Sequence, residues 1–109
     1  MIKLVYCFCR RADLTAEEFA KYWFEMHGPI GRRIPGLRRL VQSHAIAGQR
    51  NDFDGMAELW FDDLAALDAA RISAEWRESS ADEDNLIDHA RTALFVTNER
   101  EIAGPSEDA

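Results

Sequence analysis

The residue in this chain whose type and setting are best suited to chemistry is His27, in the run Trp23-Phe-Glu-Met-His27-Gly28-Pro29. Histidine has an unperturbed pKa near neutrality, so it can accept and donate a proton under physiological conditions. Trp23 lies one helical turn earlier and places apolar bulk beside the imidazole. Two interpretations remain open: a general acid or base, or a helix-terminal histidine that only interacts with the last carbonyl groups.

Two further histidines and an acidic run are weaker candidates. His44 shares a strand face with Gln42, so it could orient a substrate carbonyl or be a structural histidine with satisfied hydrogen bonds. His89 is interpreted as a surface residue. The run Asp82-Glu83-Asp84 lacks the ligand pattern of a calcium loop and is interpreted as a turn. Asp84 is a conceivable partner for His27, although the spacing gives that pairing no support.

Aromatic side chains at strand and helix spacing could wall an apolar cavity of the kind that small-molecule sites require, or could be plain core. The Gly/Pro-rich loop expected after His27 would lie at the mouth of that cavity. We therefore predict a catalytic histidine surrounded by five substrate contacts. The catalytic residue is His27, and the contacts are Tyr6, Trp23, Pro29, His44 and Trp60.

Charge and hydropathy exclude two classes of partner. The 109 residues carry a formal net charge of −7, whereas a nucleic-acid binder needs a basic surface. No apolar run approaches the roughly 20 residues needed to cross a bilayer. The strand-like pattern begins at Ile2, so no signal peptide is expected. We expect a cytoplasmic protein that binds neither nucleic acid nor membrane.

The cysteines indicate neither a disulfide nor a metal site. Cys7 and Cys9 stand two apart in a strand-like run and point to one face, so we interpret them as structural thiols, with a reactive thiol as the alternative. A zinc site needs further ligands at suitable spacing, and the histidines are scattered. We expect no metal and no cofactor. Haem ligation by one of the histidines is the less favoured alternative.

The hydrophobic pattern predicts the order strand, helix, strand, strand, helix, strand. Thr15 and Glu18 form a capping box that begins the first helix, whereas Gly28, in a left-handed conformation, and Pro29 are predicted to end it. We predict strands over 2–9, 37–47, 56–61 and 93–97, a loop over 28–36, a second helix beginning near 64, and a polar break over 79–84.

This order is typical of the ferredoxin-like βαββαβ fold of the α+β class, a four-stranded antiparallel sheet with two helices on one face. Residues 1–102 are predicted to form one domain, and residues 103–109 an acidic flexible tail.

The strands carry apolar residues on both faces. In the first strand, Tyr6 and Phe8 point one way while Val5 and Cys7 point the other. The two helices supply only one covering layer, and an exposed apolar sheet face is unusual on a monomer. We therefore expect a symmetric homodimer that packs sheet against sheet.

Several segments, in this order and spacing, resemble the EthD family of the dimeric α+β barrel superfamily. The most specific piece is Tyr22-Trp23 followed by His27-Gly28-Pro29, after Arg10-Arg11 and Thr15-Ala-Glu-Glu-Phe19. Weaker support comes from residues 38–44, 81–88 and 97–99. The resemblance covers roughly residues 1–102. It implies a homodimer whose sheets form a barrel, with a small-molecule cavity between sheet and helices in each protomer.

The resemblance also bears on chemistry. In methylmuconolactone-isomerase-like relatives, the histidine that matches His27 lies in the active cavity. Those relatives also use a cysteine after the third strand, and residues 62–72 contain none, so that isomerase chemistry is in doubt for this chain.

The function that the resemblance favours is cofactor-independent acid/base chemistry on a small apolar carbonyl or aromatic compound, as isomerisation, cyclisation, dehydration or decarboxylation. One alternative is a monooxygenase-type oxidoreductase or an accessory protein of an oxidative degradation pathway. Another is a non-catalytic dimer that binds a small molecule, so whether the chain is an enzyme stays open.

Overall fold

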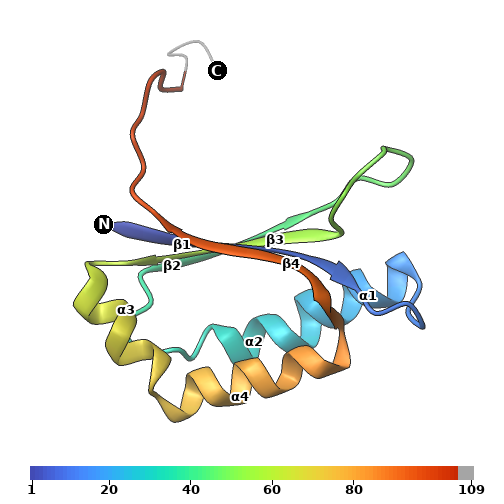
Figure 1. The fold of residues 1–109 in the computed structure, drawn as a ribbon, viewed down its shortest axis with the longest axis horizontal. Coiled ribbons are helices and arrows are strands. Elements are labelled where there is room, and N and C mark those ends of the chain that lie inside the picture. Colours follow the sequence, from blue (N-terminus) through green and yellow to red (C-terminus); the bar gives the residue numbers. More distant parts are fainter. Residues whose placement is uncertain (106–109) are drawn as a thin grey trace.

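The computed structural model describes residues 1–105, and its elements confirm the predicted βαββαβ arrangement. The strands form one antiparallel sheet in the order β2-β3-β1-β4, and the helices cover one face of it (Figure 1). The elements are β1 (Ile2–Arg10), α1 (Ala16–Tyr22), η1 (Trp23–His27), α2 (Gly28–Gly31), β2 (Arg39–His44), β3 (Gly55–Phe61), α3 (Leu64–Arg71), α4 (Ala74–Asp82), η2 (Glu83–Asn85) and β4 (Ile87–Thr97).

The first helical segment begins as predicted but does not end at Gly28. The Thr15 hydroxyl accepts from the Glu18 N–H, and the Glu18 carboxylate accepts from the Thr15 N–H, which completes the capping box. Gly28 has right-handed dihedrals (φ −53°, ψ −51°), and its N–H donates to the Trp23 carbonyl across the π-helical turn η1. The prediction of a left-handed Gly28 and a loop from residue 28 is therefore wrong.

Pro29 lies in the first turn of α2, directly after η1, and its fixed φ is compatible with the right-handed backbone of its neighbours His27 and Gly28. A π-helical turn contains one more residue than an α-helical turn. Such π-bulges often occur at functional sites. The extra residue also changes which side chains face the core. Trp23 is buried, but Met26, predicted to continue the same apolar stripe, is 56% exposed.

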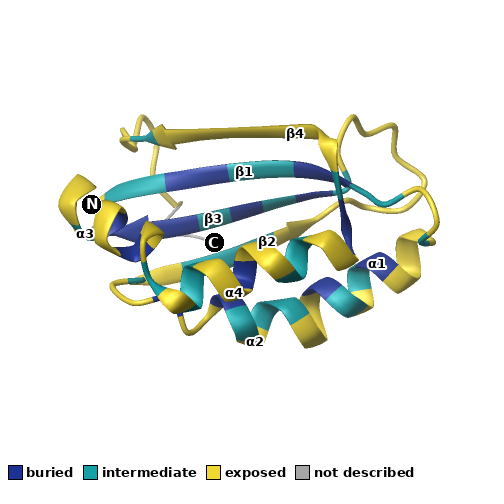
Figure 2. Ribbon diagram, turned by 60° about the horizontal axis from the view of Figure 1, so that its bottom comes forward, coloured by how far each residue is buried: buried dark blue, intermediate teal, exposed yellow. Residues whose placement is uncertain are grey.

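The second half of the chain corrects two predicted boundaries. The Ser73 hydroxyl accepts from the Trp76 N–H at 3.1 Å and caps α4, which runs through the predicted polar break to Asp82. The polar sequence of α4 suits a helix whose outer face is exposed, and Ser79 is the residue buried on its inner face. Strand β4 starts at Ile87 instead of residue 93. Its first half is polar because β4 is an edge strand and largely exposed (Figure 2).

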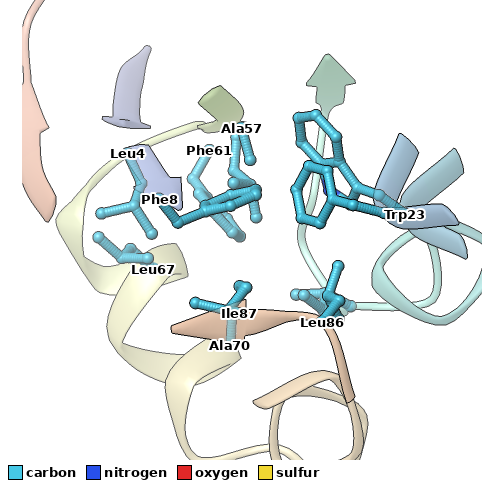
Figure 3. Packing of buried hydrophobic residues seen from close by; sticks show 12 residues of the cluster. Leu4, Phe8, Trp23, Ala57, Phe61, Leu67, Ala70, Leu86 and Ile87 are labelled. Atoms are coloured by element: carbon cyan, nitrogen blue, oxygen red, sulfur yellow. The ribbon is translucent and has the colours of Figure 1, made fainter. Parts of the chain in front are cut away.

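The core lies between the sheet and the helices, and its largest fully buried side chains are Trp23, Phe8, Phe61, Leu67 and Leu86 (Figure 3). The rings of Phe8 and Trp23 meet edge to face, with centroids 4.9 Å apart, a favourable aromatic geometry. Trp23 also lies directly on Gly55, where an added Cβ would be 2.6 Å from the indole Cζ3. The close approach of this tryptophan therefore requires glycine at that point of β3.

The predicted tail lies only in part within the described chain. Residues 103–105 are exposed and belong to no helix or strand, and residues 106–109 lie outside the described residues.

Candidate functional site

A cavity of about 250 Å³ lies between the inner face of the sheet and the helices. Its walls are mostly apolar and aromatic, from Leu4, Tyr6 and Phe8 of β1 to Trp23 and Trp76 of the helices. The polar side chains among its lining residues are Tyr6, His27, Gln42, Ser79, Ser80 and Glu83. An apolar enclosure with a few polar groups is the ordinary form of a small-molecule site.

His27 reaches this cavity from the last position of η1, and a carboxylate at the end of α4 holds it. Its Nδ1 lies 2.8 Å from Oδ2 of Asp82, the last residue of α4. The two side chains are 13% and 11% exposed. Asp82 also accepts a hydrogen bond from the Tyr22 hydroxyl at 2.6 Å and one from the Asn85 amide at 3.1 Å.

These contacts keep Asp82 ionised. Burial opposes the charged form, but the hydrogen bonds from Tyr22, His27 and Asn85, together with the charge of His27, outweigh it and hold the pKa of Asp82 below its ordinary value. An ionised carboxylate can only accept hydrogen bonds, so Nδ1 of His27 carries the hydrogen of this pair. Nε2 has no hydrogen-bond partner among residues 1–105. The arrangement leaves Nε2 as the basic nitrogen of His27.

Two further polar groups meet on the cavity wall. The Tyr6 hydroxyl lies 3.5 Å from Oε2 of Glu83, a long hydrogen bond. Burial raises the pKa of Glu83 to about 7, partly offset by the charge of His89 and the Tyr6 hydrogen bond. Burial also raises the pKa of Tyr6 to about 12, with a smaller contribution from the charge of Glu83.

The sequence interpretation missed both carboxylates. It treats 82–84 as a turn, whereas α4 extends to Asp82 and the 3-10 helix η2 follows it directly at Glu83. The available signal was the spacing of Trp76, Ser80 and Glu83, which a helix places on one face. The conceivable partner Asp84 instead lies 2.7 Å from the exposed His89 at the surface, so Asp82 is the partner of His27 and the Asp84 suggestion is wrong.

The structure brings three of the predicted site residues together on the cavity: Tyr6, Trp23 and His27. Pro29 and His44 instead line an open groove beside it. The His44 ring packs on Trp23, with centroids 4.3 Å apart, and its Nε2 is 2.9 Å from Oε1 of Gln42. Burial lowers the pKa of His44, which suits a neutral structural imidazole.

Trp60 does not contact the cavity. Ala57 and Leu59 of β3 line the cavity wall. Because side chains alternate along a strand, Trp60 lies on the outer face of the sheet. There its ring lies between the Lys3 ammonium and the Arg39 guanidinium, 5.3 and 4.7 Å from its centroid. The prediction of Trp60 as a substrate contact is corrected by this alternation.

The remaining expectations concern thiols, metals and membranes. Cys7 and Cys9 are both free, and burial raises the pKa of the Cys7 thiol. Within residues 1–105, His, Cys, Asp and Glu side chains form no group of three or more placed to hold a metal ion. Over the same residues, no helix combines the length and the apolar character that crossing a membrane would need.

Comparison with known families decides the classification. The model of the EthD domain matches residues 11–90, which include every element from the first helix to the start of β4. The chain belongs to the EthD family. A crystal structure of an EthD family protein from Bacillus halodurans is 25% identical to it, with a TM-score of 0.77 over 92% of this chain and 99% of that one.

Two more distant structures share the fold of this EthD protein. One is a dimeric protein of unknown function from Bacteroides fragilis, 14% identical, with a TM-score of 0.68 over 90% of this chain and 95% of that one. The other is SnoaB from Streptomyces nogalater, a cofactor-independent oxygenase, 16% identical, with a TM-score of 0.66 over 92% and 93%. No curated protein matches the sequence.

Proposed function

We propose that this EthD protein is a cofactor-independent enzyme that binds a small apolar carbonyl or aromatic compound in its cavity, where His27 transfers a proton. The observation that carries the proposal is the hydrogen bond from His27 Nδ1 to Asp82 at the wall of an apolar cavity. Isomerisation, cyclisation, dehydration and decarboxylation all need such a proton transfer.

The chemistry follows from the two nitrogens of the imidazole. Nε2 takes a proton from the bound compound, while Nδ1 keeps its hydrogen and its hydrogen bond to Asp82. The imidazolium that forms is then stabilised by the adjacent carboxylate, which Tyr22 and Asn85 hold in place. The same imidazolium returns the proton at another atom of the substrate. A positioned histidine of this kind contributes about 10²–10⁴-fold to a rate.

The cavity limits the size and charge of the compound. Its volume of about 250 Å³ is just below the usual range for ligand pockets, about 300–1,000 Å³, so the compound must be small. Its apolar walls and the ionised Asp82 behind His27 favour a neutral molecule over a carboxylate, since a second negative charge would be poorly solvated and repelled.

The test is hydrogen–deuterium exchange at the carbon next to a carbonyl, followed by proton NMR in D2O with a panel of small apolar ketones. We expect the wild type to accelerate exchange of at least one ketone, and His27→Gln to reduce that acceleration about 10²–10⁴-fold. His89→Gln is the matched control, because His89 also bonds a carboxylate but lies exposed at the surface. Equal exchange by wild type and His27→Gln would refute the proposal.

Oxygenation is a second candidate, favoured by the aromatic walls formed by Tyr6, Phe8, Trp23 and Trp76. Removal of a proton from an electron-rich aromatic substrate leaves an anion that dioxygen can oxidise, so His27 would serve this reaction also. SnoaB, which shares the fold, is a cofactor-independent oxygenase. Oxygen-electrode traces that show substrate-dependent uptake, absent in His27→Gln, would favour this reaction over isomerisation. A compound that binds but is never turned over would favour a non-catalytic binding dimer.

We further infer a homodimer that buries the outer face of the sheet. Alternation places Val5 and Cys7 of β1 and Phe95 of β4 on this face, and the Phe95 side chain is 60% exposed. Lys3 and Glu58 also lie here, but at 2.7 Å from each other, and a paired charge tolerates burial better than a lone one. The Bacteroides fragilis protein of the same fold is dimeric.

A further inference from the structure

Glu83 is a cavity residue that the proton transfer by His27 leaves unused. It begins η2, directly after Asp82, and lines the same cavity as His27. The two adjacent carboxyl groups have opposite surroundings. Asp82 accepts from three donors, Tyr22, His27 and Asn85, whereas Glu83 has only the long contact to the Tyr6 hydroxyl among the hydrogen bonds of residues 1–105.

Glu83 is partly buried, and a carboxylate taken out of water with so little compensation is costly, so its neutral form is favoured. The ionisable groups around Glu83 are Tyr6 of β1, His27 of η1, Asp82, Asp84 and His89. Of these, His89 favours the charged form, while Asp82 and Asp84 disfavour it, and burial is the largest effect. In many active sites, two titratable groups have surroundings that move their pKa values apart, so that one acts as the acid and the other as the base.

We propose that Glu83 is a second catalytic residue, a carboxylic acid that donates a hydrogen bond to the carbonyl oxygen of the substrate while His27 removes a proton from the neighbouring carbon. The substrate class is then the neutral enolisable ketones. This inference rests on the proposed role of His27, and it adds to that role the group that receives the developing negative charge on oxygen.

The step balances without an oxidant or a reductant. The carbon–hydrogen bond breaks and its proton passes to Nε2 of His27. The electron pair of that bond becomes the carbon–carbon double bond of the enol, and the carbonyl pair moves to oxygen, which receives the proton of Glu83. Return of a proton from the imidazolium to the same carbon, and of the enol proton to Glu83, regenerates the ketone with an exchanged hydrogen and restores both residues. In a β,γ-unsaturated ketone, delivery of the proton to the γ carbon instead moves the double bond into conjugation and gives the isomerised ketone.

The test uses 2-tetralone, an apolar enolisable ketone whose carbonyl can only accept a hydrogen bond. Wild type, Glu83→Gln, Glu78→Gln and His27→Gln are compared for binding and for deuterium exchange between pH 5 and pH 8. Glu78 is the matched control, because it is an exposed glutamate of α4, the helix that leads into η2, and it pairs with Arg33.

We expect the dissociation constant of the wild type to rise about tenfold from pH 5 to pH 8, because one pH unit above a pKa of about 7 leaves roughly a tenth of Glu83 protonated. Glu78→Gln should follow the wild type. Glu83→Gln should bind with little dependence on pH, since its amide still donates a hydrogen bond, and should exchange at least tenfold more slowly at pH 5. Identical pH profiles for wild type and Glu83→Gln would overturn the role of Glu83.

The two proposals fail separately. Loss of exchange in His27→Gln together with an unchanged Glu83→Gln refutes only the role of Glu83, whereas unchanged exchange in His27→Gln refutes the role of His27. Urea unfolding adds a readout that needs no ligand. With a folded pKa of about 7 and an ordinary pKa of 4.5 for glutamate, the stability contributed by Glu83 is present below pH 4.5 and is lost as pH rises to about 7. The wild type should therefore lose stability relative to Glu83→Gln between pH 5 and pH 8, and parallel curves would contradict a neutral Glu83.

Discussion

The Nδ1 atom of His27 and the Oδ2 atom of Asp82 lie 2.8 Å apart, although 55 residues separate them in the chain. The contact joins the π-helical turn that follows α1 to the last residue of α4. It engages Nδ1 and leaves Nε2 free on a residue that lines the cavity. Carboxylates orient histidines that act through their second nitrogen in the same way.

Asp82 is a positioning residue, since it touches His27 and does not line the cavity. We expect Asp82→Asn to lower kcat for deuterium exchange about 10–100-fold and to leave KM nearly unchanged, because the substrate contacts are intact. Asp82→Glu should restore part of the loss. Asp84→Asn is the control, as Asp84 bonds the surface residue His89. A change in KM with kcat constant would show that Asp82 does not act through His27.

The Tyr22 hydroxyl donates to Asp82 at 2.6 Å, and Tyr22→Phe removes this bond. We expect a loss of about 1.5 kcal/mol in the free energy of unfolding at pH 7, the lower end for hydrogen bonds to charged groups. The pKa of Asp82 is lowered in the folded state, so its stabilisation is present above the unfolded pKa and is lost as pH falls through the folded pKa.

The penalty of Tyr22→Phe should therefore shrink in acid, as urea unfolding at pH 7 and at pH 3 can measure. Tyr22→Phe combined with Asp82→Asn completes a double-mutant cycle. Additive effects of the two substitutions at pH 7 would contradict a direct contribution from this hydrogen bond.

Gly55 is predicted to be intolerant of any side chain. A Cβ there would lie 2.6 and 2.8 Å from two carbons of the Trp23 indole and 3.2 Å from the Phe8 ring. Alanine ordinarily improves a strand glycine by reducing chain entropy, but here we expect Gly55→Ala to destabilise the fold by about 1–3 kcal/mol through overpacking.

Gly31→Ala is the control for this substitution, because its Cβ would meet Leu40 at an ordinary 3.5 Å. It should be neutral or stabilising by up to about 1 kcal/mol. Thermal or urea unfolding distinguishes the two, and a Gly55→Ala variant as stable as the wild type would mean that Trp23 has another packing available.

The inferred dimer interface on the outer face of the sheet can be tested by introducing one charged side chain. Phe95→Glu places a carboxylate on the surface that we infer to be buried between two copies, and we expect it to produce monomers at micromolar concentration. Phe24→Glu is the matched control, since Phe24 is 66% exposed and Phe95 60%, but Phe24 lies on the helical side. Light scattering or sedimentation gives the mass, and a wild-type monomer would exclude this interface.

The strand order and the general fold follow from local patterns in the sequence. Alternation along β1, the capping box of Thr15 and Glu18, and the turn residues between strands act over a few neighbouring residues, and each predicts its element correctly. Residue type and spacing also predict His27, Trp23 and Tyr6 as a titratable group among aromatics, and all three line the cavity. The same local rules place Trp60 and Tyr6 on the two faces of the sheet once the register is known.

The tertiary structure decided what local rules could not. Gly28 and Pro29 are strong stop signals, yet the helical run passes through them: Gly28 keeps right-handed dihedrals, its N–H donates to the Trp23 carbonyl, and Pro29 lies in the first turn of α2. The amide of Gln42 in β2 donates to the same carbonyl at 2.9 Å. The ionic partner of His27 is Asp82, which only the packing of two helical segments brings near. The burial of Glu83 depends equally on the sheet beneath it. The sequence by itself determined the fold and the candidate base, whereas the partner of that base and the protonation of its neighbour depend on distances and solvent exclusion that arise only when the layers pack.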